Sequence, residues 1–395
     1  MTEVRDDRYD RQMRLPGFGP TGQARLRSSR ILVAGCGALG TVVAEYLVRA
    51  GVGTVEIVDR DVVERSNLQR QTLFTESDAR RGVPKAEAAK ARLAVVNGES
   101  SVRAIVADLS PENAAALCAR ADLLVDCLDN FETRYVLNDC AVARGVPLVH
   151  GGAVGFRGVA TAILPASGPG EGRLVRWSDA HATPCLACLA PEAPAPGEVD
   201  TCDSAGVLGA AAGVVGSIEA GLALRLVAEE TVAILPTLVR IDLATLAFSS
   251  AASAGARDPA CECCVGRRFR HLAPPAGEAS PERRPRVLCG QNAVELALRG
   301  PLGEEEIEQL GRRLRGSGLD VETERFGGTI ALRVASLPAI DAFGARDGTP
   351  GRSGDVSDAR ACLSILAGPA STLAVVSGTS DPEVARAVVA RWIGA

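Results

Sequence analysis

The chain has 395 residues, of which 47% are hydrophobic and only 3% aromatic, so its core must be built mainly from aliphatic and small side chains. Its formal net charge is -5, from 43 basic and 48 acidic residues. This mildly acidic balance argues against a surface for nucleic acid and against one for an anionic membrane. The length allows two or three domains at about 100–200 residues each.

The N-terminus predicts no secretory signal, because MTEVRDDRYD is charged from its third residue and contains no apolar stretch. Two uncharged segments are candidates for membrane spans. The first, 204–218, stops at Glu219, short of the roughly 20 residues that a span needs. The second, 361–380, is interrupted by a Gly-Pro pair and is better interpreted as two short strands. We therefore expect no membrane segment and a cytoplasmic protein.

Short apolar runs alternate with helical patterns over the first part of the chain. The predicted strands are 31–35, 55–59, 102–108 and 123–127, and the predicted helices between them are 39–51, 84–97 and 111–120. This alternation is typical of βαβ units around a parallel sheet. Three further strand-like runs, 147–154, 159–165 and 237–248, predict an antiparallel extension. The expected fold class is α/β, with a Rossmann-like, mostly parallel sheet.

The chain then changes character twice. Residues 179–203 lack periodicity and carry prolines and cysteines, which predicts a long crossover loop. Residues 273–285 have the composition of a linker, so we predict one domain over 1–272 and a small α+β module of unknown role over 286–395. A last helix is predicted from the apolar spacing of Val384, Val388 and Trp392, with Ser380 as its cap.

The run ILVAGCGALG, residues 31–40, ends a strand in three glycines with the spacing of a dinucleotide-binding loop. Such a turn lets the backbone approach a phosphate and points a helix N-terminus at it. Asp59 ends the next strand, where a carboxylate can bind ribose hydroxyls. These features fit NAD and ATP equally well. The polar segment 59–71 favours a triphosphate, because Arg70 and, further on, Lys85 can neutralise phosphate oxygens.

The segment VDCLDN, residues 125–130, ends a further strand, at the edge where open α/β sheets bind ligands. A carboxylate there suits Mg²⁺, which prefers oxygen ligands. Asp129 is the predicted ligand. For Asp126 and Asn130 a second interpretation stays open, since either can cap the helix that begins near Phe131.

Twelve cysteines are present, and four of them form two C-x-x-C pairs. CLAC contains Cys185 and Cys188, and CECC contains Cys261 and Cys264. Two such pairs predict a tetrahedral Zn²⁺ site with no open position, and therefore a structural metal. Cys263 stays open as an alternative to Cys264. Other cysteines are predicted to be small core residues: Cys36, Cys118, Cys127, Cys140, Cys289 and Cys362.

Cys202 and His150 are the remaining candidates for chemistry. Cys202 lies in DTCDSAG at the end of the predicted crossover loop, which makes it a candidate nucleophile, although the two flanking aspartates oppose thiolate formation. His150 follows a strand and could line the same cleft. We favour the interpretation that it is a core histidine with satisfied hydrogen bonds, so no proton-transfer residue for an oxidoreductase stands out.

The motifs RYDRQMRL, GCGALG, VDRDVVERSNLQRQ, VPKAE, VDCLDN, CLAC, TC and CECC occur in this order between about residues 5 and 272. In these motifs the chain resembles the ThiF/MoeB family, the bacterial E1-like adenylyltransferases that activate ubiquitin-like sulfur-carrier proteins. The resemblance implies that the carrier's C-terminal glycine carboxylate attacks the α-phosphate of ATP, that pyrophosphate leaves, and that an acyl adenylate forms. Sulfur then displaces AMP to give a thiocarboxylate.

The resemblance also implies roles for individual residues. Arg70 and Lys85 hold the phosphates, Asp129 binds Mg²⁺, and Arg11 reaches the site from the other subunit of a homodimer. Cys202 matches the cysteine that can bond the carrier's terminus in thiamine-type relatives. The full set implied for nucleotide binding is Gly35, Gly37, Ala38, Gly40, Asp59, Asp61, Asn67, Arg70, Gln71, Lys85, Asp129 and Asn130.

The implied partners are a ubiquitin-like sulfur-carrier protein ending in Gly-Gly, serving thiamine, molybdopterin or a related sulfur-containing metabolite, and a separate persulfide donor. A separate donor is expected because neither Cys289 nor Cys362 has an arginine six positions on, as a rhodanese-type loop would. Two alternatives stay open. The glycine loop and Asp59 also suit an NAD-dependent oxidoreductase, and a catalytically silent E1-like binding module would keep the same fold.

Overall fold

The computed structural model describes residues 7–166, 174–177, 181–191, 205–229, 237–253 and 256–272 of the N-terminal part. In the C-terminal part it describes 286–288, 293–298, 302–335, 337, 362–367, 372–377, 379 and 382–393. The chain divides into two compact units, 1–274 and 275–395. This division falls within 273–285, the predicted linker, which lies outside the described residues.

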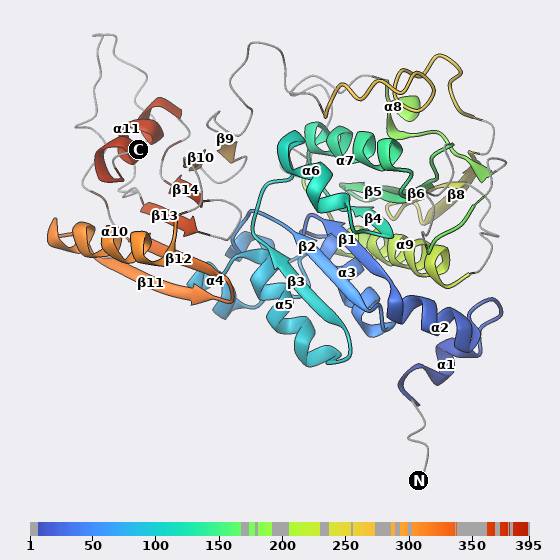
Figure 1. The fold of residues 1–395 in the computed structure, drawn as a ribbon, viewed down its shortest axis with the longest axis horizontal. Helices are drawn as coiled ribbons and strands as arrows, with labels where there is room; N and C mark the ends of the chain where they lie inside the picture. The colour runs from blue at the N-terminus through green and yellow to red at the C-terminus, as the bar shows by residue number, and fades with distance from the viewer. Residues whose placement is uncertain are drawn as a thin grey trace. The chain divides into compact units, whose positions relative to one another are not determined.

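An eight-stranded sheet forms the centre of the N-terminal unit, in the spatial order β3-β2-β1-β4-β5-β6-β7-β8 (Figure 1). Strands β1 to β5 are parallel, and β6, β7 and β8 extend the sheet in antiparallel fashion. Their bounds are β1 Arg30–Ala34, β2 Thr54–Val58, β3 Ser101–Ile105, β4 Leu123–Asp126, β5 Leu148–Val154, β6 Arg157–Ile163, β7 Thr237–Asp242 and β8 Ala247–Ala252. The predicted Rossmann-like sheet with an antiparallel extension is confirmed.

Helices cover both faces of this sheet. The chain moves outward from β1 to β3 and then returns to β4 and β5, and right-handed crossovers in the two directions place their helices on opposite faces. Thus α6 and α7 lie on one face and α3, α5 and α9 on the other (Figure 1). The bounds are η1 Asp7–Tyr9, α1 Asp10–Met13, α2 Gly19–Ser28, α3 Gly40–Arg49, η2 Arg65–Asn67, α4 Glu76–Arg81, α5 Lys85–Val96, α6 Pro111–Cys118, α7 Phe131–Arg144, α8 Leu186–Leu189 and α9 Gly209–Ala228.

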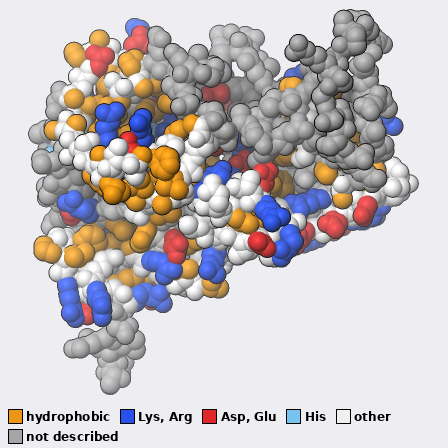
Figure 2. Space-filling view, turned by 180° about the vertical axis from the view of Figure 1, so that it is seen from behind, with side chains coloured by type: hydrophobic (Ala, Val, Ile, Leu, Met, Phe, Trp, Pro, Cys, Tyr) orange, Lys and Arg blue, Asp and Glu red, His pale blue; other side chains and the backbone are white. Residues whose placement is uncertain are grey.

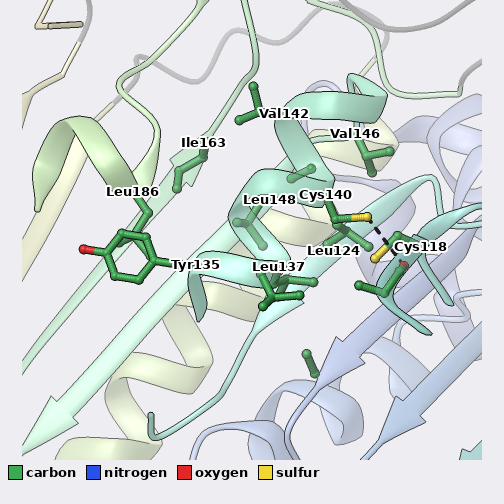
Figure 3. Packing of buried hydrophobic residues seen from close by; sticks show 14 of the residues in the cluster. Cys118, Leu124, Tyr135, Leu137, Cys140, Val142, Val146, Leu148, Ile163 and Leu186 are labelled. Carbon is green, nitrogen blue, oxygen red and sulfur yellow. Dashed lines mark hydrogen bonds between the residues drawn. The ribbon is translucent and has the colours of Figure 1, made fainter. Parts of the chain in front are cut away.

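Small and aliphatic side chains fill the core between the sheet and helices α6 and α7 (Figure 3). Leu124 of β4 and Leu148 of β5 are almost fully buried there, together with Leu137 and Cys140 of α7. Many short side chains thus supply the packed volume that few aromatics could. Most of the cysteines predicted as core residues are buried (Cys36, Cys118, Cys127 and Cys140), but Cys362 is partly exposed and Cys289 lies outside the described residues.

Most of the uncharged run 204–218 lies in α9, a helix rich in small residues. The helix continues past Glu219, whose side chain is fully buried, to Ala228. Within the described residues α9 is long and apolar enough to cross a membrane by length and composition. It instead packs against α3, β5 and β6 as a core helix. Gly216 permits the close approach, because a Cβ there would lie 3.0 Å from the carbonyl oxygen of Leu39.

The prediction of a single strand over 237–248 is wrong. Strands β7 and β8 form an antiparallel hairpin, joined by residues 243–246. Leu246 has a positive φ of 56°, which reverses the chain without a glycine. Apolar residues on both sides of the turn make the run continuous in the sequence and hide the reversal.

The C-terminal unit is a six-stranded antiparallel sheet with two helices, in the order β11-β12-β13-β14-β10-β9. Leu332, Ile365 and Val388 are buried in its core, and Trp392 packs against them. On the face seen in Figure 2, acidic and basic side chains alternate over part of this unit. Arg325 forms ion pairs with Glu304 and Glu308. The bounds are β9 Arg286–Leu288, β10 Ala293–Ala297, α10 Glu304–Gly316, β11 Val321–Phe326, β12 Thr329–Val334, β13 Cys362–Ala367, β14 Thr372–Ser377 and α11 Pro382–Trp392.

The predicted α+β module is therefore confirmed, and the run 361–380 forms two strands, β13 and β14, as expected. The last helix, α11, carries Val388 on its buried face, in agreement with the predicted apolar spacing. Ser380, the predicted cap, lies outside the described residues.

Candidate active site

A pocket of about 1160 Å³ opens in the N-terminal unit at the carboxyl ends of the parallel strands. It begins at the glycine loop after β1, passes the ends of β2, β3 and β4, and continues along the antiparallel strands β6 and β7. The chain order reverses between β1 and β4, and open α/β sheets bind ligands at such switch points. The fold therefore explains why most of the predicted site residues meet here.

Close backbone contacts require glycine at two positions of the loop after β1. Gly35 has a φ of +89°, and a Cβ there would lie 2.7 Å from the carbonyl oxygen of Cys127. A Cβ on Gly40 would lie 2.0 Å from the carbonyl oxygen of Gly35. The turn brings the N-terminus of α3 to the pocket, whose wall here consists of Gly35, Gly37 and Ala38. Gly40 begins the helix and packs behind this wall, so its contribution is to the shape of the loop.

Asp59, after β2, connects the glycine loop to the rest of the pocket. Its Oδ2 accepts a hydrogen bond from the backbone N–H of Cys36 at 2.6 Å, and its Oδ1 accepts one from Asp61 N–H at 2.8 Å. Burial raises the pKa of Asp59 to about 6, although the ammonium group of Lys85 acts in the opposite direction. The carboxylate therefore holds the loop in place and still borders the pocket.

Lys85 provides a buried positive charge in the pocket. It is the first residue of α5, only 5% exposed, and its Nζ donates to Asp61 Oδ2 at 2.7 Å. Burial alone would lower the pKa of Lys85, but the carboxylates of Asp61 and Asp59 raise it above its usual value. The same ion pair holds the pKa of Asp61 below its usual range against the effect of burial. Asp61 is thus the direct partner of Lys85.

The segment after Asp61 brings a second cation to the pocket. Arg70 lines it and donates from Nη1 to the carbonyl oxygen of Ser66 at 3.0 Å. Gln71 is buried beside it, and its Oε1 has no hydrogen-bond partner among the described residues. Asn67 is buried in the capping box of η2, where its Oδ1 accepts from Glu64 N–H at 3.0 Å, and it does not line the pocket.

The loop after β4 carries Asp129 and Asn130, which are both exposed and line the pocket. Asn130 is also the cap of α7, because its Oδ1 accepts from Thr133 N–H at 2.9 Å. Asp126 is neither that cap nor exposed to the pocket's solvent: it is fully buried and contacts His150 Nδ1 at 2.7 Å. The carboxylate that faces open space in this loop is therefore that of Asp129.

Two predicted residues lie apart from this pocket. Arg11 is exposed on α1 and does not line the pocket of its own chain. Cys202 lies outside the described residues.

The pocket also contains residues that sequence reasoning missed. Arg134, one turn into α7, lines the wall and donates from Nη2 to the carbonyl oxygen of Leu128. Arg60 lines it near the end of β2 and approaches Asp108 at 3.5 Å. Arg134 could have been predicted as a pocket residue, because it follows the helix cap at the end of β4 by one helical turn. Arg60 could not, because an arginine between two aspartates has no pattern that indicates a pocket.

The two C-x-x-C pairs meet in space, away from the pocket. The sulfurs of Cys185, Cys188, Cys261 and Cys264 all lie within 4.8 Å of one another, with a shortest separation of 3.4 Å between Cys188 and Cys264. Four clustered thiols form the donor set that tetrahedral Zn²⁺ prefers. Cys263 is not one of these four thiols, and its Sγ lies 3.2 Å from Asp139 Oδ1. The geometry therefore favours Cys264 over Cys263 as the fourth donor.

Comparison with known proteins gives a consistent result. The model of the ThiF family matches residues 9–263. The chain is 35% identical to the sulfur carrier protein ThiS adenylyltransferase of Bacillus subtilis, over 98% of this chain and 99% of that protein. It is 41% identical to the SAMP-activating enzyme E1 of Haloferax volcanii, over 62% of this chain and 84% of that protein. Crystal structures of E. coli MccB share the fold, with a TM-score of 0.53, 22% identity and coverage of 67% of this chain and 76% of that one in the complex with MccA-N7isoASN.

Proposed function

The chain belongs to the ThiF family, and from this membership and the pocket we propose that it is an adenylyltransferase that activates the C-terminal glycine of a ubiquitin-like sulfur-carrier protein with ATP. The carrier carboxylate attacks the α-phosphate, the bond to the β-phosphate breaks, and pyrophosphate leaves. Because two anions must approach each other, positioned cations supply most of the catalysis.

The observation that carries the proposal is the buried ammonium group of Lys85 in a pocket bounded by the glycine loop. Lys85 is held charged by Asp61 at 2.7 Å and lies at a helix N-terminus, which also favours an anion. Arg70 adds a second positive charge at the same wall. A dinucleotide site has little use for two cations after its ribose-binding acid, so this arrangement favours a triphosphate over NAD. In this proposal Asp59 binds the ribose.

We assign Mg²⁺ to Asp129. This carboxylate is exposed at the pocket, and its charge acts on Lys85, so it lies near the proposed phosphate site. A carboxylate oxygen of this kind fits the ion's preference, and bound Mg²⁺ would neutralise charge on the phosphate chain. Gln71 and Asn130 border the same space and are proposed to hydrogen-bond the nucleotide.

We assign Zn²⁺ to the four clustered cysteines as a structural ion. It would join the segment around α8 to the segment after β8, which are distant in sequence. All four ligands come from the protein, so no position remains open for catalysis. Reduced, paired thiols of this kind also support the proposed cytoplasmic location.

The antiparallel end of the pocket is the proposed entrance for the carrier's tail. The pocket continues past Gly155 and Phe156 to Arg240 and Ala244, so an extended peptide can lie there with its terminus toward the nucleotide. Phe156, Leu246 and Phe248 are 52%, 76% and 61% exposed at this end. Such apolar side chains are suited to contact with a partner protein. Sulfur is proposed to come from a separate persulfide protein.

The decisive experiment is ATP–pyrophosphate exchange in the presence of a ThiS-type carrier ending in Gly-Gly, with Mg²⁺ and zinc-loaded protein. We expect exchange that depends on the carrier and is abolished by Asp129→Ala. A catalytically silent module would show no exchange in either form. An oxidoreductase would be stabilised by NAD instead of ATP, by about 2.7 kcal/mol at a hundredfold excess over Kd, which a melting-temperature measurement resolves.

Arg11 supports a second test, of the proposed homodimer. If Arg11 completes the site of the partner subunit, Arg11→Ala and Asp129→Ala homodimers are both inactive. Random mixing of the two inactive proteins makes about half of the dimers heterodimers, and each heterodimer has one intact site out of two. About a quarter of the wild-type exchange should therefore return. No recovery after verified subunit exchange would contradict the role of Arg11 across the interface.

A further inference from the structure

His150 is a buried titratable side chain at the pocket wall that the proposed adenylation does not use. It lies on β5, directly beside Asp126 of β4, with which it is paired in the parallel register. Its Nδ1 lies 2.7 Å from Asp126 Oδ2, and its side chain is 9% exposed, whereas that of Asp126 is fully buried. The same histidine lines the pocket.

The surroundings of Asp126 determine which atom of the Asp126–His150 pair carries the shared proton. Asp126 Oδ1 accepts from Leu128 N–H at 3.1 Å, and the guanidinium group of Arg134 lies 4.0 Å away. Burial would raise the pKa of Asp126, but Arg134 and His150 hold it below its usual range, so the carboxylate stays ionised. An ionised carboxylate can only accept a hydrogen bond, so Nδ1 carries a proton, and in the neutral ring the lone pair is therefore on Nε2.

Among the hydrogen bonds of the described residues, that of the His150 ring is made by Nδ1, and the ring borders the pocket. Glu219 of α9 and the thiol of Cys127 also act on Asp126, and these two side chains lie 4.0 Å apart. Burial raises the pKa of Glu219 well above its usual value, and Asp126 is the carboxylate in contact with the histidine, at 2.7 Å.

The position of His150 between the two ends of the pocket suggests its task. The glycine loop and Asp59 border one end, and β6 and β7 border the other, so the acyl adenylate of the proposed function would have its reactive carbon near the middle. A nucleophile that displaces AMP from that carbon must lose a proton if it arrives as a thiol. A carboxylate-oriented imidazole is the arrangement that enzymes use for such a transfer.

We propose that His150 accepts the proton of the sulfur nucleophile that displaces AMP from the carrier's acyl adenylate. The incoming group is a thiol or persulfide, R–SH. Its S–H bond breaks and the proton moves to Nε2 of His150, while sulfur bonds to the acyl carbon. The C–O bond to AMP breaks, AMP leaves with the electron pair, and Asp126 stabilises the imidazolium ion. No oxidant or reductant is needed for this step, and the inference rests on the proposed adenylation.

The test separates the two half-reactions. Enzyme, ATP, Mg²⁺, pyrophosphatase and a ThiS-type carrier are mixed to accumulate the adenylate, and 2-mercaptoethanol is then added as the thiol. We expect His150→Gln to slow the thiol-dependent release of AMP about 100-fold, as for loss of a general base, and to reduce ATP–pyrophosphate exchange by no more than about fivefold. His181→Gln is the matched control, because His181 does not line the pocket, and it should change neither rate more than about twofold.

A second variant guards against a structural explanation. In His150→Ala, added imidazole should restore part of the thiol-dependent rate, because a free base can occupy the vacated space, whereas it should not accelerate the wild type. An equal loss of exchange and thiolysis, or thiolysis that is unaffected by His150→Gln, overturns the inference. Absence of exchange in the wild-type protein overturns the proposed function itself and this inference with it.

Discussion

Lys85 allows stability and catalysis to be separated in one experiment. It forms a buried ion pair with Asp61, so Lys85→Met removes a catalytic cation and leaves the Asp61 carboxylate with the more distant Arg60, at 3.7 Å, as an ion-pair partner. In Lys85→Met/Asp61→Asn the carboxylate charge that Lys85 compensated is removed as well, but the cation is still missing. We therefore expect the second substitution to restore stability and to leave catalysis impaired.

The size of the effect follows from the geometry. Across 2.7 Å the Coulomb attraction is about 6 kcal/mol at an effective dielectric constant of about 20. The Asp61 side chain is 29% exposed, so water solvates it when Lys85 is absent. We therefore expect a net loss of about 2–3 kcal/mol in Lys85→Met, slightly below the range for breaking a fully buried pair. For a unit of this size that lowers Tm by roughly 5–10 °C.

The assays are thermal unfolding and carrier-dependent ATP–pyrophosphate exchange. We expect Lys85→Met to lose Tm as stated and exchange by about 10²–10³-fold, as for removal of one transition-state donor. The double variant should regain most of the lost Tm and none of the exchange. Lys90→Met is the matched control on the same helix, since Lys90 pairs loosely with Glu87 and is 41% exposed. Exchange that returns in the double variant would refute the role of Lys85 as a phosphate-binding cation.

Three further outcomes follow from the structure. Cys264→Ser should abolish the binding of one zinc per chain whereas Cys263→Ser retains it, measured by metal analysis; equal loss in both would contradict the ligand assignment. Because burial raises the pKa of Glu219 above its value in the unfolded chain, the folded protein favours the protonated acid, and this contribution to stability is present at low pH and lost as pH rises. Glu219→Gln should therefore raise Tm at pH 8 and less so near pH 5, and a gap that is independent of pH would count against the shift. Arg70→Ala should reduce exchange about 100-fold with a Tm change under about 2 °C, because the substitution removes one hydrogen bond, that to the carbonyl oxygen of Ser66 at 3.0 Å; a large loss of Tm would indicate a structural role instead.

Patterns within a short segment were interpreted correctly. The alternation of strands and helices, the three glycines and the two C-x-x-C pairs each express a local requirement: a period of 2 or 3.6, a turn with no room for Cβ, or two thiols at a fixed spacing. Gly35 and Gly40 show the reason, since a side chain at either position would collide with the backbone whatever the rest of the chain does.

Patterns whose structure depends on a partner far away in the sequence were not interpreted correctly. The run 237–248 contains no glycine or proline to mark a turn, so the reversal at Leu246 was visible only once β7 and β8 were paired. Glu219 interrupts an uncharged run in the sequence, and only the fold shows that its charged side chain is fully buried within α9.

The sequence by itself thus determined the fold class, the glycine loop, the two cysteine pairs and the family resemblance, because each depends on neighbours along the chain. The tertiary structure alone decided that Cys263 contacts Asp139, that Asp61 holds Lys85, and that Asp126 contacts the His150 ring. These are contacts between residues 24 to 124 positions apart. A hydrogen bond has steep requirements of distance and angle, and only the folded backbone can satisfy them across such separations.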